Sequence, residues 1–166
     1  ITDLLSRIRI NLVSGGVTYF NADNNEKAFE LFSKYIDVAD APMFAQFNYA
    51  ETDSLMPEIA YYATLAGLKM EDYNKALKYV DLAMKKEDVA QKAIEYKAMS
   101  YLNLGDTINW LNALKVGVEK YPEVEFCHAT GTNAHTAGLA NFHNAFAHIY
   151  QGRYLAGVVA GMKLKE

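Results

Sequence analysis

The chain has a single cysteine, Cys127, and three prolines among its 166 residues. One cysteine excludes an internal disulfide and a zinc site built from several cysteines. No window approaches the ~18 uninterrupted apolar residues of a transmembrane helix, so we expect no membrane insertion. Asp3, Arg7 and Arg9 also interrupt any apolar core of a signal peptide near the start. Because the chain begins at Ile1, a leader could have been removed, and the cytoplasm and the periplasm or cell envelope both stay open.

Clusters of basic residues are missing as well. Lys and Arg number 16 against 20 Asp and Glu, which gives a net charge of −4. Neutralising phosphates requires a basic face, so we expect no nucleic-acid partner. The sequence also lacks a G-x-S-x-G elbow, a phosphate loop and an H-E-x-x-H pair. We therefore predict that the protein is not an enzyme, with no catalytic residues and no cofactor.

Acidic residues are absent from Phe126 to Lys165, although this tail holds all four histidines and half of the ten glycines. Cys127, His128, His135, His143 and His148 suggest a metal site at first sight. His143 and His148 are five residues apart, which on a helix separates them by about 140° at ~100° per residue. Ligands on one helix would need to share a face, so we predict no metal site and interpret these as surface or interface histidines.

The sequence does contain an internal repeat. Residues 57–90 and 91–124 form two consecutive units of equal length, each with two amphipathic stretches around a polar turn (MEDY, then LGDT). Tyr73 and Thr107 occupy equivalent positions in the two units, and so do Val80 and Leu114. A period of about 34 residues, built from two helices, is typical of a helix–turn–helix solenoid.

The flanking segments fit the same scheme less closely. Residues 3–21 and 26–39 are predicted helices, and aligning Ala28 with Ala76 makes 9–42 a first repeat. Residues 43–56 are too apolar for a loose linker, so we predict an ordered insertion packed on one edge. Residues 125–137 form a second insertion. Residues 138–166 are predicted to be a fourth, degenerate repeat, helical from Leu139.

The central units resemble tetratricopeptide repeats (TPR), whose pattern places small and aromatic residues at fixed offsets in a unit of about 34 residues. The positions that carry the resemblance are Tyr73, Ala76, Ala83, Ala98, Tyr101, Gly105-Asp106, Gly117 and Pro122. Departures exist: Ala63-Thr64 and Lys97-Ala98 replace the Leu-Gly pair, and Trp110 stands where Ala76 stands. The Tyr- and Asn-rich composition also resembles that of Bacteroidetes TPR proteins. The resemblance implies one all-α domain over 1–166, a right-handed α-α superhelix.

In such arrays the first helix of each repeat lines a concave face that binds partners. The resemblance therefore implies a scaffold or adaptor that binds a protein or peptide in this groove. No Lys/Asn/Arg set that would clamp a carboxylate is present, and an apolar helix or extended segment is the expected ligand. The groove residues that it implies are apolar or aromatic: Val13, Val17, Phe20, Tyr61, Leu65, Leu68, Met99, Leu102, Phe142 and Phe146.

Two alternatives remain at this point. The chain's own residues, including the insertion 43–56, could fill the groove. The protein would then be a structural spacer in a larger envelope or multi-repeat protein, with no ligand of its own. An open apolar surface could instead be covered by a second copy of the chain in a homodimer, because large exposed apolar patches are unusual on monomers.

Overall fold

The computed structural model describes residues 2–129, 135–136, 138–145, 154–156, 158–159 and 162–163. The chain divides into two compact units, Ile1–Gly117 and Val118–Glu166, where the sequence predicts a single domain. Each unit is described by itself. None of the helices in the described ranges has the length and apolar character needed to cross a lipid bilayer.

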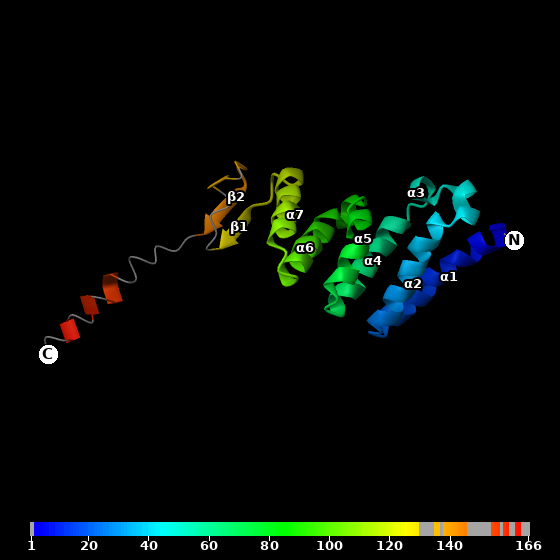
Figure 1. The fold of residues 1–166 in the computed structure, drawn as a ribbon, viewed down its shortest axis with the longest axis horizontal. Helices are drawn as coiled ribbons and strands as arrows, with labels where there is room; N and C mark the ends of the chain where they lie inside the picture. The colour runs from blue at the N-terminus through cyan, green and yellow to red at the C-terminus, as the bar shows by residue number, and fades with distance from the viewer. Residues whose placement is uncertain are drawn as a thin grey trace. The chain divides into compact units, whose positions relative to one another are not determined.

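The first unit is a stack of antiparallel helix pairs. Its long helices are α1 (Thr2–Asn21), α2 (Asn25–Asp37), α4 (Met56–Lys69), α5 (Tyr73–Ala83) and α6 (Glu87–Asn103), and α7 (Thr107–Lys120) begins in this unit. From α1 to α6, consecutive long helices are in contact, and α4 also contacts α6 (Figure 1). The pairs α1/α2, α4/α5 and α6/α7 correspond to the repeats predicted at 9–42, 57–90 and 91–124. The fold is all-α and TPR-like, as predicted.

The polar turn inside each pair has the same construction. A residue with positive φ comes first, and the next residue caps the second helix: Asp23 then Asn24, Glu71 then Asp72, and Gly105 then Asp106. Each cap side chain accepts the backbone N–H three residues on, at 3.2, 3.0 and 3.0 Å respectively. This bond satisfies one of the donors left free at a helix N-terminus. It also lowers the pKa of Asp72, mainly through the Lys75 N–H.

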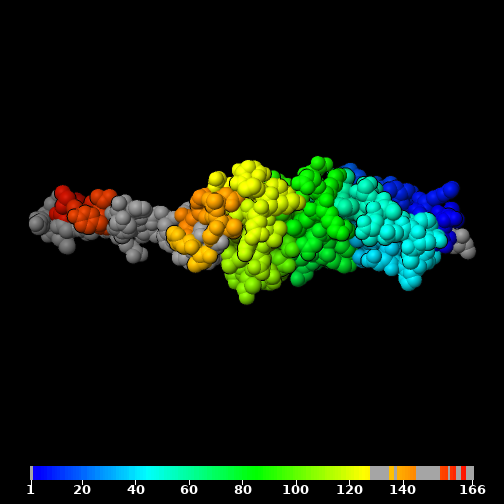
Figure 2. Space-filling view, turned by 90° about the horizontal axis from the view of Figure 1, so that it is seen from above, coloured from blue at the N-terminus to red at the C-terminus, as the bar shows by residue number. Residues whose placement is uncertain are grey.

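The insertion predicted at 43–56 lies in the segment between α2 and α4. This segment consists of three short helices, η1 (Val38–Asp40), η2 (Pro42–Phe47) and α3 (Tyr49–Thr52). The rings of Phe44, Phe47 and Tyr49 pack on one another with centroids 5.4–6.1 Å apart. The segment lies beside the N-terminal part of α1, where Figure 2 shows it in cyan against blue. The Asp53 side chain accepts the N–H of Leu55, the residue before α4.

The core of the first unit combines small residues with a few large ones. Fully buried alanines allow the helices to approach closely, and Phe32 and Val80 fill the space between them. The core members from α2, α4 and α5, together with one residue of α6, are Ala28, Phe29, Phe32, Tyr35, Ile36, Met56, Ile59, Ala60, Ala63, Ala66, Tyr79, Val80, Ala83 and Ala93. Ala28 and the equivalent Ala76 are buried, and so are Phe32 and the equivalent Val80, whereas the corresponding Leu114 is half-buried.

Gly67 marks the closest approach of α4 to α5, and replacing it with alanine tests this contact. A Cβ at Gly67 would lie 2.5 Å from the backbone N and 2.8 Å from the Cα of Ala76. The backbone of α5 cannot yield as a side chain can. We expect Gly67→Ala to lower the free energy of unfolding by about 2 kcal/mol in urea, in spite of the better helix propensity of alanine.

Gly15→Ala is the matched control in another helix interior. The nearest atom to its added Cβ is the Leu31 Cδ1 methyl at 3.1 Å, the end of a flexible side chain. We expect unchanged stability or a gain of up to about 1 kcal/mol. Equal losses for both variants would contradict the assignment of Gly67 as the contact point.

The second unit contains a small parallel sheet. β1 (Phe126–Ala129) pairs with β2 (Phe142–Ala145), and Phe126 lies opposite Phe142. The buried amide of Asn141 donates to the carbonyl oxygens of Val118, Tyr121 and Val124 at 2.9–3.2 Å. The N–H of Phe126 donates to the carbonyl oxygen of Asn141 at 2.8 Å. These bonds place the start of β2 beside β1.

This strand corrects part of the predicted fourth repeat. Phe142 was predicted on a helix that begins at Leu139, and it lies in β2 instead. Phe, His and Asn are weak helix formers, and aromatic residues are enriched in strands. The residues of β2 are therefore compatible with pairing to β1. The described pieces at 154–156, 158–159 and 162–163 are helical.

Candidate protein-binding surface

Eight of the ten predicted groove residues lie on three neighbouring helices of the first unit. Val13, Val17 and Phe20 belong to α1, the next three to α4, and Met99 and Leu102 to α6. Helices α4 and α6 are in contact, and the Phe20 ring of α1 lies edge-on to Tyr62 of α4, with centroids 5.9 Å apart. Phe142 belongs to the second unit, and Phe146 lies outside the described residues.

The predicted residues differ in exposure. Val17, Met99 and Leu102 are 40%, 42% and 52% exposed. Leu65 and Leu68 of α4 are half-buried. Val13, Phe20 and Tyr61 are partly buried and pack against the core. They therefore connect this face to the core. We call the set Val13, Val17, Phe20, Tyr61, Leu65, Leu68, Met99 and Leu102 the first-helix face.

Tyr61 is at the centre of an aromatic group on this face. Its ring stacks on Tyr96 of α6, with centroids 5.9 Å apart and planes 26° from parallel, and contacts Tyr62 edge-on at 5.7 Å. Burial, followed by the hydrogen bond with the Tyr96 side chain, raises the pKa of Tyr61 to about 12. The hydroxyl therefore remains a proton donor throughout the neutral range. Tyr62 and Tyr96 were missed as site residues, although they occupy equivalent positions in the two clear repeats.

The charged residues next to this face pair with one another. Lys86 contacts Glu58 at 2.5 Å, Lys92 contacts Glu95 at 2.8 Å, and Lys69 contacts Asp23 at 3.1 Å. The ammonium group of Lys69 also lies 4.9 Å from the centre of the Phe20 ring. Apolar and aromatic side chains thus lie among charges that are neutralised within the chain.

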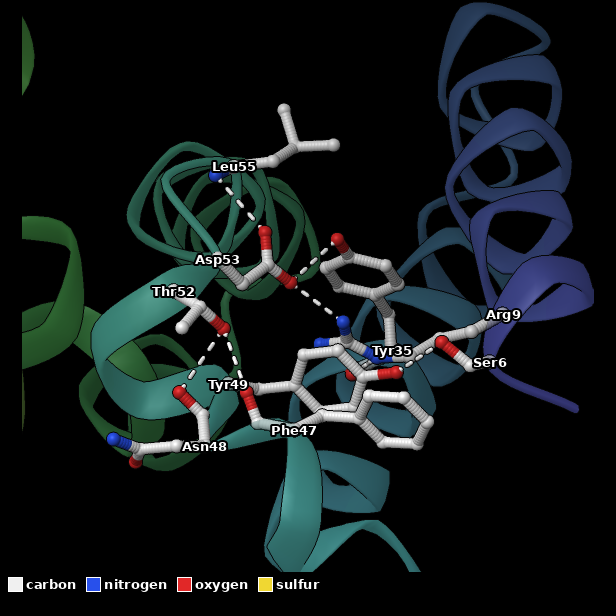
Figure 3. Close-up of polar contacts among 9 residues, drawn as sticks. All are labelled: Ser6, Arg9, Tyr35, Phe47, Asn48, Tyr49, Thr52, Asp53 and Leu55. Atoms are coloured by element: carbon white, nitrogen blue, oxygen red, sulfur yellow. Dashed lines mark hydrogen bonds and ion pairs between the residues drawn. The ribbon is translucent and has the colours of Figure 1, made fainter. Parts of the chain in front are cut away.

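A buried ion pair fixes the insertion against α1 (Figure 3). Arg9 of α1 contacts Asp53 Oδ2 at 2.5 Å and donates from Nε to the carbonyl oxygen of Tyr35 at 3.0 Å. The Tyr35 hydroxyl donates to the same Asp53 oxygen at 2.8 Å, and burial followed by this bond raises the Tyr35 pKa. The Arg9 guanidinium lies over the rings of Tyr35 and Tyr49, 3.7 and 4.2 Å from their centres.

The cluster around Arg9 and Asp53 connects parts of the fold. It joins α1, α2, α3 and the segment before α4, and Ser6 shares a hydrogen bond with the Tyr49 hydroxyl at 2.5 Å. Sequence reasoning missed it, because the partners of Arg9, Tyr35 and Asp53, are 26 and 44 residues away along the chain. The one available signal was a lone arginine among apolar residues on the inner side of the first helix.

Comparison with known protein families identifies the central helices. Residues 58–100 match the model of the Fis1 C-terminal tetratricopeptide repeat, which covers most of α4, all of α5 and most of α6. The chain carries a TPR-like domain. The match does not extend to the narrower resemblance to Bacteroidetes proteins. Neither the curated proteins nor the solved structures contain a match to the chain.

A TPR-like domain indicates protein–protein interaction in general, and the matched family is a non-catalytic interaction domain. Two clefts in the first unit lie away from the first-helix face. One of about 760 Å³ is lined by α2 and α5, including Phe29, Ser33 and Lys78. The other, of about 270 Å³, lies between α1 and η2 and includes Ile8 and Met43. Neither contains a residue of the first-helix face.

The tail outside the TPR-like repeats carries the cysteine and the histidines. Cys127 is exposed, and the exposed His143 contacts Glu125 at 2.5 Å through Nε2. Within the described part of the chain, no group of three His, Cys, Asp or Glu side chains is placed to hold a metal ion. His148 lies outside the described residues.

Proposed function

We propose that the TPR-like domain is a scaffold or adaptor that binds an apolar protein segment on the first-helix face. The observation that carries this proposal is the exposure of Val17 on α1 and of Met99 and Leu102 on α6, the first helices of the first and third pairs. Covering such side chains with a partner removes apolar surface from water, at about 25 cal/mol per Å². The packed floor of Val13, Phe20 and Tyr61 supports the proposal further, because a rigid surface loses little entropy on binding.

The packing of Val13, Phe20 and Tyr61 on the core also favours a second candidate function. Because those three residues already pack on the core, part of the predicted groove is covered by the chain itself. A structural spacer in a larger envelope or multi-repeat protein would need no more than this. A homodimer that buries the exposed part of the face is a further alternative, and light scattering at several concentrations would detect it.

Selection from a library of displayed peptides tests the proposed function. Peptides selected against the full 166-residue chain are measured by calorimetry against Met99→Glu, which places a charge in the face. We expect the affinity to fall at least tenfold, because a buried unpaired carboxylate is costly at an interface.

Met43→Glu is the matched control. Met43 is 48% exposed, close to the 42% of Met99, but lies on η2 at the other cleft. Binding should be unchanged by this substitution. A library that yields no binder favours the spacer, and binders that Met43→Glu weakens as much as Met99→Glu place the site elsewhere. Either result rejects binding on the first-helix face.

A further inference from the structure

Four aromatic rings form a continuous row across the three first helices. Phe20 of α1 contacts Tyr62 of α4 at 5.9 Å, Tyr62 contacts Tyr61 at 5.7 Å, and Tyr61 contacts Tyr96 of α6 at 5.9 Å, all between ring centroids. The row crosses the helices instead of following one of them. A ligand that uses all four rings must therefore also run across α1, α4 and α6.

The hydroxyl groups in this row favour an extended ligand over a helical one. The stacked Tyr61 and Tyr96 each carry a hydroxyl hydrogen that can be donated to an incoming acceptor. A helical ligand keeps nearly all its carbonyl oxygens in its own hydrogen bonds. A polyproline II segment makes no internal hydrogen bonds, so each of its carbonyl oxygens can accept from a tyrosine.

The charges beside the row and the separation of packed helices also favour a polyproline II ligand. Glu58, Glu95 and Asp23 beside the row are paired with Lys86, Lys92 and Lys69, so these residues present balanced charge and favour an uncharged ligand. Packed helices are about 8–10 Å apart. Three residues of polyproline II, one full turn, rise about 9 Å. A segment of this kind presents equivalent residues to successive first helices.

We propose that the ligand of the first-helix face is an uncharged, proline-rich segment in the polyproline II conformation. This inference rests on the proposed function and adds the chemical class of the partner. Aromatic-lined grooves suit such segments because their backbone is pre-ordered and loses little entropy on binding. Tyr61 is the central residue, since it contacts both Tyr62 and Tyr96.

Blocked decaproline is the probe, titrated into the ¹⁵N-labelled full chain and followed by amide chemical shifts. We expect saturable binding, with shifts concentrated on α4 and α6. Tyr61→Phe, which removes only the hydroxyl, should weaken binding about fivefold, and Tyr61→Ala at least tenfold. Tyr19→Phe is the matched control, because Tyr19 lies on α1 outside the row and should leave the affinity unchanged.

A blocked, uncharged amphipathic helical peptide is titrated in parallel. It distinguishes a failure of the proline-rich ligand from a failure of binding on the first-helix face. If it binds the first-helix face and decaproline does not, the proline-rich ligand is rejected and the proposed function stands. If neither probe binds and the peptide library also yields no binder, both fail. Decaproline binding that Tyr61→Phe and Tyr19→Phe change equally also rejects the inference, because the row would not be the site.

Discussion

Replacing Asp53 with alanine is expected to lower the free energy of unfolding by about 3–5 kcal/mol. The Arg9 side chain is only 5% exposed, so removing its partner leaves a buried charge without a counter-charge. The Tyr35 hydroxyl loses its acceptor, and Leu55 loses the side chain that accepts its N–H. Urea unfolding followed by circular dichroism gives the change. Limited proteolysis should show earlier cleavage in residues 42–52, which the cluster holds against α1.

Glu30→Ala is the control for this prediction. Glu30 also pairs with a cation, Lys34, but both side chains are 58% exposed, so we expect little change in stability when this pair is removed. The double variant Arg9→Met, Asp53→Leu should recover much of the loss, since apolar residues can replace a buried ion pair when both charges go together. A cost below about 1 kcal/mol for Asp53→Ala would show that the pair does not hold the insertion.

The parts of the fold that the sequence predicted are those specified by neighbouring residues. The repeat period predicts two helices, one on either side of each polar turn, and in the structure Asp72 and Asp106 cap the second helix of each pair. The insertion was recognised from its aromatic content. The proposed first-helix face rests on the same period, since its residues occupy repeat-equivalent positions of α1, α4 and α6.

The parts that could not be predicted depend on contacts between distant residues. Arg9 and Asp53 are 44 residues apart, and no local pattern connects them. The pairing of β1 with β2 depends on Asn141 reaching three carbonyl oxygens between Val118 and Val124. Periodicity alone favours a helix there, because Leu139 and Phe142 are spaced like one. Half of the aromatic row was predicted, because Phe20 and Tyr61 were among the groove residues, whereas Tyr62 and Tyr96 were not singled out.

Phe32→Ala is expected to cost about 3–5 kcal/mol of stability, as is usual for removing a buried phenylalanine. Phe32 is completely buried, and its ring centroid lies 6.5 Å from Phe20 and 6.2 Å from Tyr62. The cavity would open directly beneath two members of the aromatic row. We therefore expect decaproline, if it binds as proposed, to bind this variant more weakly even under conditions where the variant is fully folded.

Gly16 provides the internal control, because a Cβ at this position would overlap the ring of Phe32 at Cε1 and Cδ1. Gly16→Ala should therefore destabilise the wild-type chain by about 1–3 kcal/mol. In the Phe32→Ala background the ring is gone, and the same substitution should be neutral or stabilise by up to about 1 kcal/mol. The two changes are thus non-additive, as expected for residues in direct contact. Additive losses in this double-mutant cycle would contradict the packing of α1 on α2 through Gly16 and Phe32.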